Sequence, residues 1–237
     1  MDALLLETLS CSIGYLRYIL TAVAALLVIN ALLKPDREVF RKILHTVAYS
    51  SSAAFVASTG DWRAASLASA AFAIIVYPAL SLGEHWSGYG RFFNQRSTGE
   101  VKHSLLELFF TFSAINAFTW GLLGSPWLGV CAILMWGPGD AAAALIGRHF
   151  GRHKIHLPHA DSHKSWEGSF AMAATSLVIG VICLTLGGVF SLPAALLASL
   201  LTAPIAAYTE LITKNGNDTV TVPVVNALLL GLLYLFL

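Results

Sequence analysis

The stretch GPGDAAAALIGRHFGRHKIHLPHADSHKSWEGS, from Gly137 to Ser169, joins two long apolar runs. It holds two arginines, two lysines, five histidines and several acids, although the 237-residue chain is 57% hydrophobic and only 11% charged. The mean hydropathy of +0.71 is too high for an ordinary water-soluble domain. Apolar runs of about 20 residues are long enough to cross a bilayer as helices. The quoted segment is therefore expected where two membrane helices meet at a membrane surface.

Similar apolar runs recur along the chain and predict an all-α, polytopic membrane protein with about seven or eight transmembrane helices, because a helix satisfies its own backbone hydrogen bonds in lipid. No soluble domain is visible, so residues 1–237 are predicted to form a single integral membrane domain. One helix is expected to be broken at Gly137–Gly139, because Pro138 lacks an N–H and the glycines loosen the backbone. The expected helices cover residues 8–33, 40–59, 62–82, 103–123, 126–149, 167–187, 190–212 and 220–237.

The basic residues lie on one side of this predicted bundle. All lysines and arginines except Arg17 and Arg63 fall in or beside the connections after the first, third, fifth and seventh helices. An excess of Lys and Arg keeps short loops in the cytoplasm, so these connections are predicted to face it. All eight histidines fall on the same side, which favours a polar site facing the cytoplasm. The net charge of +1 gives no indication of nucleic-acid binding.

Asp140 is the first candidate for a functional residue. It follows Gly139 inside an apolar run. A carboxylate in a membrane helix is costly and marks a functional site by default. The alternative is that Asp140 only caps the half-helix that follows the expected break.

The segment from Arg148 to Lys164 is rich in cations and offers little apolar surface. Arginine binds phosphate as a two-pronged fork and lysine as a point charge, so this loop is predicted to bind a nucleotide. One alternative is a solvated loop that only fixes the topology, and another is a zinc site built from histidines. The predicted nucleotide-binding residues are Arg148, Arg152, Lys154, Lys164 and Ser165. The histidines of the zinc alternative are His149, His153, His156, His159 and His163.

The segment SHKSWEGS opens the next helix, with Ser165 as its expected N-cap. Backbone amides at a helix N-terminus attract phosphate, but Glu167 in the first turn repels it unless a divalent cation lies between them. Mg²⁺ is typically held by one or two carboxylates and by the phosphates themselves. The predicted Mg²⁺ ligands are Asp140, Glu167 and Asp218. The alternative for Asp218 is a place in a turn, because Asn-Gly and Asn-Asp in NGNDTVTVP are common in turns. The alternative for Glu167 is a favourable interaction with the helix dipole.

Weaker candidates surround this centre. Arg41, Lys42 and His45 lie on one face of an expected helix. His103 and Glu107 are four residues apart, as are Glu210 and Lys214, and each pair is expected to form a local ion pair. The lower-ranked site residues are Glu107, Lys102, His45, Arg41 and Lys42.

The motif GDAAAALIGRHFGRHKI, followed by KSWEGSFAM, resembles the CTP-dependent lipid-alcohol kinases: phytol kinase, dolichol or polyprenol kinase, and yeast-type diacylglycerol kinase. The likeness extends to REVFRKILHTVAYS near the start and to NDTVTVPVVNALL near the end, so it covers most of the chain from about Glu38 onward. The central block is also similar to the CDP-diacylglycerol synthases, but the closing signature of those enzymes is missing here.

The resemblance implies an enzyme that transfers the γ-phosphoryl group of CTP, with Mg²⁺, to the hydroxyl of a polyprenol or dolichol, a phytol-like prenol or a diacylglycerol. It implies catalytic roles for Asp140, Lys164 and Glu167. The active site of the integral membrane protein is expected to face the cytoplasm, with the lipid alcohol, the nucleoside triphosphate and the bilayer as partners. The oligomeric state is not indicated. The alternatives are a phosphatidate cytidylyltransferase and a membrane transporter whose broken helix binds a substrate.

Overall fold

The computed structural model describes residues 3–86, 89, 99–155, 164–213 and 216–237, and the side chains of all of these except residues 37, 38 and 100. Within these residues the structure has eight α-helices, one short π-helix and no strand. Seven helical segments are long and apolar enough to cross a membrane. The prediction of an all-α polytopic membrane protein is therefore confirmed, and each expected helix has its counterpart.

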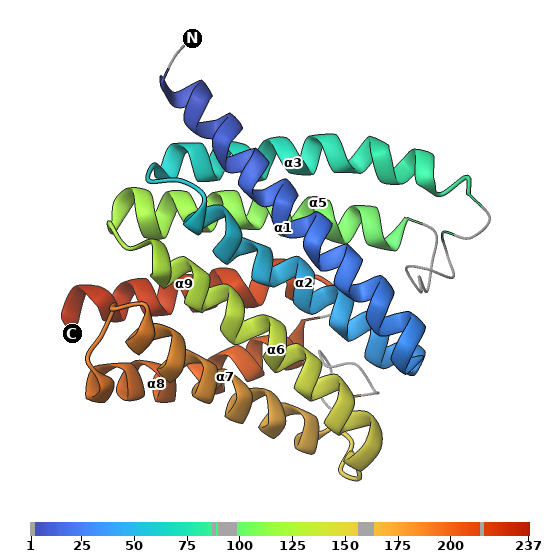
Figure 1. The fold of residues 1–237 in the computed structure, drawn as a ribbon. Helices are drawn as coiled ribbons and strands as arrows, with labels where there is room; N and C mark the ends of the chain where they lie inside the picture. Colours follow the sequence, from blue (N-terminus) through green and yellow to red (C-terminus); the bar gives the residue numbers. More distant parts are fainter. Residues whose placement is uncertain (1–2, 87–88, 90–98, 156–163, 214–215) are drawn as a thin grey trace. The chain divides into compact units, whose positions relative to one another are not determined.

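The chain folds into two compact units, Met1–Ala117 and Phe118–Leu237, each of which is described by itself. The predicted single domain over residues 1–237 stays a prediction. The described helices of the first unit, with the labels of Figure 1, are α1 (Ala3–Leu33), α2 (Arg37–Ala57), α3 (Trp62–Gly83) and α5 (Glu100–Asn116).

Aromatic rings form the core of the first unit. Tyr15 of α1 stacks on Phe55 of α2 with ring centroids 4.2 Å apart, and meets the edge of Phe72 of α3 at 4.4 Å. Phe109 of α5 contacts the same rings. These contacts join all four helices, because each contributes one large ring to a buried cluster.

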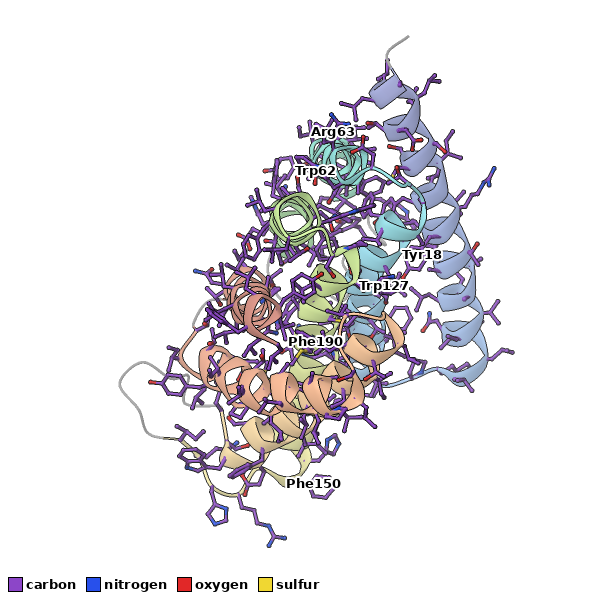
Figure 2. The ribbon with its side chains drawn as sticks, turned by 90° about the vertical axis from the view of Figure 1, so that its left-hand side faces the viewer. Tyr18, Trp62, Arg63, Trp127, Phe150 and Phe190 are labelled. Carbon is purple, nitrogen blue, oxygen red and sulfur yellow. The ribbon has the colours of Figure 1, made fainter. Side chains whose placement is uncertain are left out.

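The second unit contains the segment quoted at the outset. It begins within the π-helix η1 (Ala117–Leu122) and continues with α6 (Pro126–Phe150), α7 (Trp166–Leu186), α8 (Leu192–Ile212) and α9 (Asp218–Phe236). Successive helices run in opposite directions (Figure 1). The C-terminal ends of α6 and α8 and the N-terminal ends of α7 and α9 therefore lie at one end of this unit, which we call the loop end. Phe150 marks the loop end of α6 and Trp127 its opposite end (Figure 2).

The predicted break at Gly137–Gly139 is wrong, because α6 is one continuous helix with Pro138 inside it. Side chains of neighbouring helices bond to α6 carbonyls in the turns before the proline. Ser176 Oγ donates to Met135 O at 2.7 Å and Asn226 Nδ2 to Ala132 O at 3.1 Å. Polar side chains of this kind let a membrane helix tolerate proline without breaking. The transporter alternative loses the broken helix on which it depended.

Small residues bring α6 and α7 into close contact along their length. A Cβ atom added at Gly139 would lie 2.7 Å from Ser176 Oγ, and one added at Gly168 would lie 2.8 Å from Ala143 O. Small residues at such crossings allow the backbones of membrane helices to approach. The two helices that flank residues 151–165, which we call the polar segment, are therefore held in a fixed register.

Candidate functional site

Backbone hydrogen bonds join the two described ends of the polar segment. Ile155 N donates to Lys164 O and Trp166 N donates to His153 O, both at 3.1 Å. Lys154 and Ser165 thereby form an isolated antiparallel bridge. The residues between, 156–163, lie outside the described part of the chain. The bridge fixes the backbone of Lys164 relative to the end of α6.

Ser165 is the N-cap of α7, as predicted. Its hydroxyl oxygen accepts a hydrogen bond from Gly168 N at 3.2 Å, which satisfies one of the free amides at the helix start. The side chain is buried, and a Cβ atom added at Gly151 would lie 2.6 Å from its oxygen, while one added at Gly147 would lie 3.2 Å from it. Its predicted contact with nucleotide stays a prediction. The structure assigns this serine a role in packing the start of α7 against the end of α6.

Lys164 joins the polar segment to the end of α8. Its Nζ lies 3.0 Å from Glu210 Oε1, and it donates to the backbone oxygens of Glu210 and Thr213, the latter at 3.1 Å. These acceptors match the three N–H donors of an ammonium group. The side chains of Lys164 and Glu210 are only 19% and 11% exposed, so water screens the ion pair little. Lys164 also satisfies carbonyls that the end of a helix leaves free.

Asp140 and Asp218 lie within electrostatic range of the Glu210 carboxylate. Asp140 is in the interior of α6 and Asp218 is the first residue of α9. The N-cap alternative for Asp140 is therefore wrong, because no helix begins there. A hydrogen bond between Thr213 Oγ1 and Thr221 Oγ1 at 3.1 Å joins the end of α8 to the start of α9. Lys164, Glu210 and Asp218 thus lie at the loop end, and the Asp140 carboxylate inside α6 acts on Glu210 electrostatically.

Glu167 contacts both the first turn of its own helix, through its own backbone amide, and the residues that follow α6. Its Oε1 accepts hydrogen bonds from the backbone amides of Arg152 and His153 at 3.2 Å, and lies 2.7 Å from His153 Nδ1. The carboxylate thereby satisfies amides just beyond the end of α6. The predicted Mg²⁺ contact of Glu167 stays a prediction.

The predicted phosphate-binding cations Arg148, Arg152 and Lys154 are exposed at the loop end. His149 bonds to Leu145 O of its own helix at 2.9 Å. Three of the five histidines of the zinc alternative, His156, His159 and His163, lie outside the described residues.

The lower-ranked candidates belong to the first unit and are described within it. Lys102 pairs with Glu84 at 2.6 Å, and its neighbour His103 packs against Tyr77. Glu107 is exposed, and the structure has no ion pair between it and His103. The expected pairing within α5 is therefore wrong. In α2, Lys42 is buried, Arg41 is partly buried and His45 is exposed.

The donor chemistry of the loop end suits a divalent cation. Among the described residues, no group of three or more His, Cys, Asp and Glu side chains is arranged to hold a metal ion. Mg²⁺ does not require such a group, because it usually takes one or two carboxylates and completes its shell with water and phosphate. The carboxylates of Asp140 and Asp218 supply oxygen donors of this kind, so the residues fit the predicted cation.

Glu210 is the site residue that the sequence reasoning missed. A local ion pair with Lys214 was expected, but Glu210 pairs with Lys164, and Lys214 lies outside the described residues. One signal was available in the sequence. Glu210 is a carboxylate near the end of an apolar run, and the reasoning that selected Asp140 applies equally to it.

Comparison with known proteins identifies a relative. No family model and no solved structure matches the chain. A curated protein, the phytol kinase of Synechocystis sp. (strain ATCC 27184 / PCC 6803 / Kazusa), is 30% identical over 210 residues. The alignment covers 85% of this chain and 82% of the relative. It extends over most of the eight helices described above, and the protein therefore belongs to the lipid-alcohol kinase family that includes this phytol kinase.

Proposed function

We propose that this protein transfers the γ-phosphoryl group of CTP to the hydroxyl of a membrane lipid alcohol, with a phytol-like prenol as the first candidate. One observation supports the proposal: Lys164 and Glu210 form an ion pair at the loop end, where Asp218 begins α9 and Asp140 of α6 acts electrostatically on Glu210, in a chain related to a phytol kinase. The choice of CTP over ATP rests on the sequence resemblance.

The depth of the site supports a lipid acceptor. Glu210 is two residues from the end of α8, and Asp218 begins α9. Both acids are therefore expected at the level of the lipid headgroups. Ile205, Tyr208 and Ile212 expose one face of α8 near Glu210. A prenol whose chain lies along such an apolar face would present its hydroxyl at the membrane surface, where nucleotide arrives from water.

In the proposed reaction the lipid hydroxyl oxygen attacks the γ-phosphorus, the bond from that phosphorus to the bridging oxygen breaks, and CDP leaves. The hydroxyl proton passes to a general base. Bound Mg²⁺ would neutralise phosphate charge. Arg148, Arg152 and Lys154 are expected to bind the polyphosphate, and Lys164 supplies a fixed positive charge. Catalysis of phosphoryl transfer consists mostly of such positioning and electrostatic stabilisation.

A labelling experiment tests this function. Purified protein is incubated with Mg²⁺, CTP and a panel containing phytol, a polyprenol, dolichol, diacylglycerol and phosphatidate. Label at the γ-phosphate is expected in the extracted lipid, with CDP in the aqueous phase, and label at the α-phosphate is expected to stay in the nucleotide. The competing cytidylyltransferase reaction moves α-label into phosphatidate and releases pyrophosphate. That result would refute the kinase proposal.

The cytoplasmic orientation is part of the proposal and has its own test. A cysteine introduced at Ala160, in the polar segment, is expected to resist an impermeant reagent added outside intact cells and to react after permeabilisation. Labelling from outside would reverse the orientation and the route by which nucleotide enters.

A further inference from the structure

The contacts of Lys164 fix this residue from two sides. Its backbone oxygen accepts the Ile155 amide in the bridge that closes the polar segment. Its ammonium group ends in three contacts at the C-terminus of α8, two with Glu210 and one with Thr213. A lysine side chain has a flexible four-carbon stem and loses about 2 kcal/mol of rotamer entropy when it is fixed. Holding the ammonium in one place therefore requires a strong partner.

Glu210 is that partner, because it supplies the only charged acceptor among the three. A hydrogen bond to a charged group contributes more than one to a neutral carbonyl. The pair is also largely shielded from water, since Glu210 is only 9% exposed as a whole residue. The carboxylate thus decides where the positive charge of Lys164 lies, and Asp140 and Asp218 act electrostatically on the same carboxylate.

We propose that Glu210 is a positioning residue of the kinase site, which holds the Lys164 ammonium at a fixed place so that its charge stabilises the phosphoryl group during transfer. The inference rests on the proposed function. It assigns Glu210 no contact with substrate, and its effect is transmitted through Lys164.

A purely structural role is the competing explanation. The ion pair joins the start of α7 to the end of α8, and a tie of this kind stabilises the fold whether or not it serves catalysis. The two explanations differ when both charges are removed together. Neither partner then remains as a buried unpaired charge, so the fold is expected to recover much of its stability.

Four proteins separate these explanations: the wild type, Glu210→Gln, Lys164→Met and the double variant. Thermal unfolding in detergent measures stability, and kcat and KM are measured well below every unfolding midpoint. Lys164→Met is expected to lower the midpoint most, because it leaves the Glu210 carboxylate without its ammonium partner. The double variant is expected to unfold at a temperature closer to that of the wild type.

Activity is expected to follow a different order. Glu210→Gln keeps an oxygen acceptor but loses the charge, so kcat should fall about tenfold. Lys164→Met should lower kcat about 100-fold, and the double variant should be no worse. The KM for the lipid should change little in all three. Glu210→Asp is expected to restore part of the activity lost in Glu210→Gln.

Two results would overturn the proposal. If kcat of the double variant recovers together with its stability, the pair is only a structural tie. If Glu210→Gln lowers kcat by the same factor in the wild type and in Lys164→Met, Glu210 acts independently of Lys164. Glu7→Gln is the matched control, because Glu7 accepts a hydrogen bond from Thr59 in the first unit and should leave kcat unchanged. Absence of lipid phosphorylation by the wild type refutes the proposed function itself, which is a distinct outcome.

Discussion

Replacement of Gly168 by alanine tests the contact between α6 and α7 on which the loop end depends. The new Cβ would lie 2.8 Å from Ala143 O and 3.4 Å from Gly147 Cα, whereas non-bonded heavy atoms pack best at about 3.5–4.0 Å. Both neighbours are backbone atoms of α6, so the close contact can be removed only if one of the two helices moves. Overpacking of this severity costs about 3 kcal/mol, and the higher helix propensity of alanine returns about 1 kcal/mol. The net loss of about 2 kcal/mol lowers the unfolding temperature by about 4–8 °C.

Thermal unfolding in detergent measures this loss, and kcat is measured in parallel. Gly168 also donates to the Ser165 cap beside Lys164, so the shift should displace the ammonium and lower kcat by about tenfold, since small misplacements of a catalytic group are costly. Gly60→Ala is the matched control, because nothing lies within 4 Å of a Cβ added there. If Gly168→Ala unfolds at the temperature of the control and keeps full activity, the close crossing inferred from these distances is wrong.

Three further predictions concern single carboxylates. Asp140→Asn should lower kcat by about 100-fold or more without unfolding the protein. When activity is titrated with Mg²⁺, the variant should need a higher Mg²⁺ concentration for half of its maximal activity. An active variant with unchanged Mg²⁺ dependence refutes the assignment. Glu167→Gln should lower the unfolding temperature, because the bonds to Arg152 and His153 lose their charged acceptor, and it should weaken the Mg²⁺ dependence of activity if Glu167 holds the cation. Lys102 holds the pKa of Glu84 below its ordinary value of 4.5, so this pair stabilises the fold above that pH and the stabilisation is lost as the pH falls through the lowered pKa; the difference in unfolding temperature between wild type and Glu84→Gln should therefore shrink on acidification below 4.5, and a constant difference would contradict it.

The helices were predictable from the sequence because their cause is local. Each apolar run has to form a helix in lipid, so its existence follows from hydropathy alone. The continuity of α6 was not predictable, and neither were the hydrogen bonds that Ser176 and Asn226 donate to α6 carbonyls before Pro138 from two other helices. The sequence contains both residues but gives no indication that they face α6.

The candidate site was predictable to the same degree. Asp140 stands out as a carboxylate in an apolar run, and Ser165 follows from the chemistry of helix caps. The partner of Lys164 does not follow from spacing, because Glu210 is 46 residues further along the chain. Spacing favoured a partner four residues away, and that preference led to the wrong ion pair for Glu107, whereas the expected pair of Glu210 with Lys214 stays a prediction because Lys214 lies outside the described residues. Contacts between distant segments are set by packing, which the sequence does not display.

The distribution of the site over four helices has a consequence for biogenesis. Asp140 leaves the ribosome first, followed by Lys164, Glu210 and finally Asp218. Until α8 has entered the membrane, the Lys164 ammonium lacks all three of its acceptors. Asp218 joins these residues only when α9 inserts. The activity proposed above is therefore expected only after the last helix has entered the membrane.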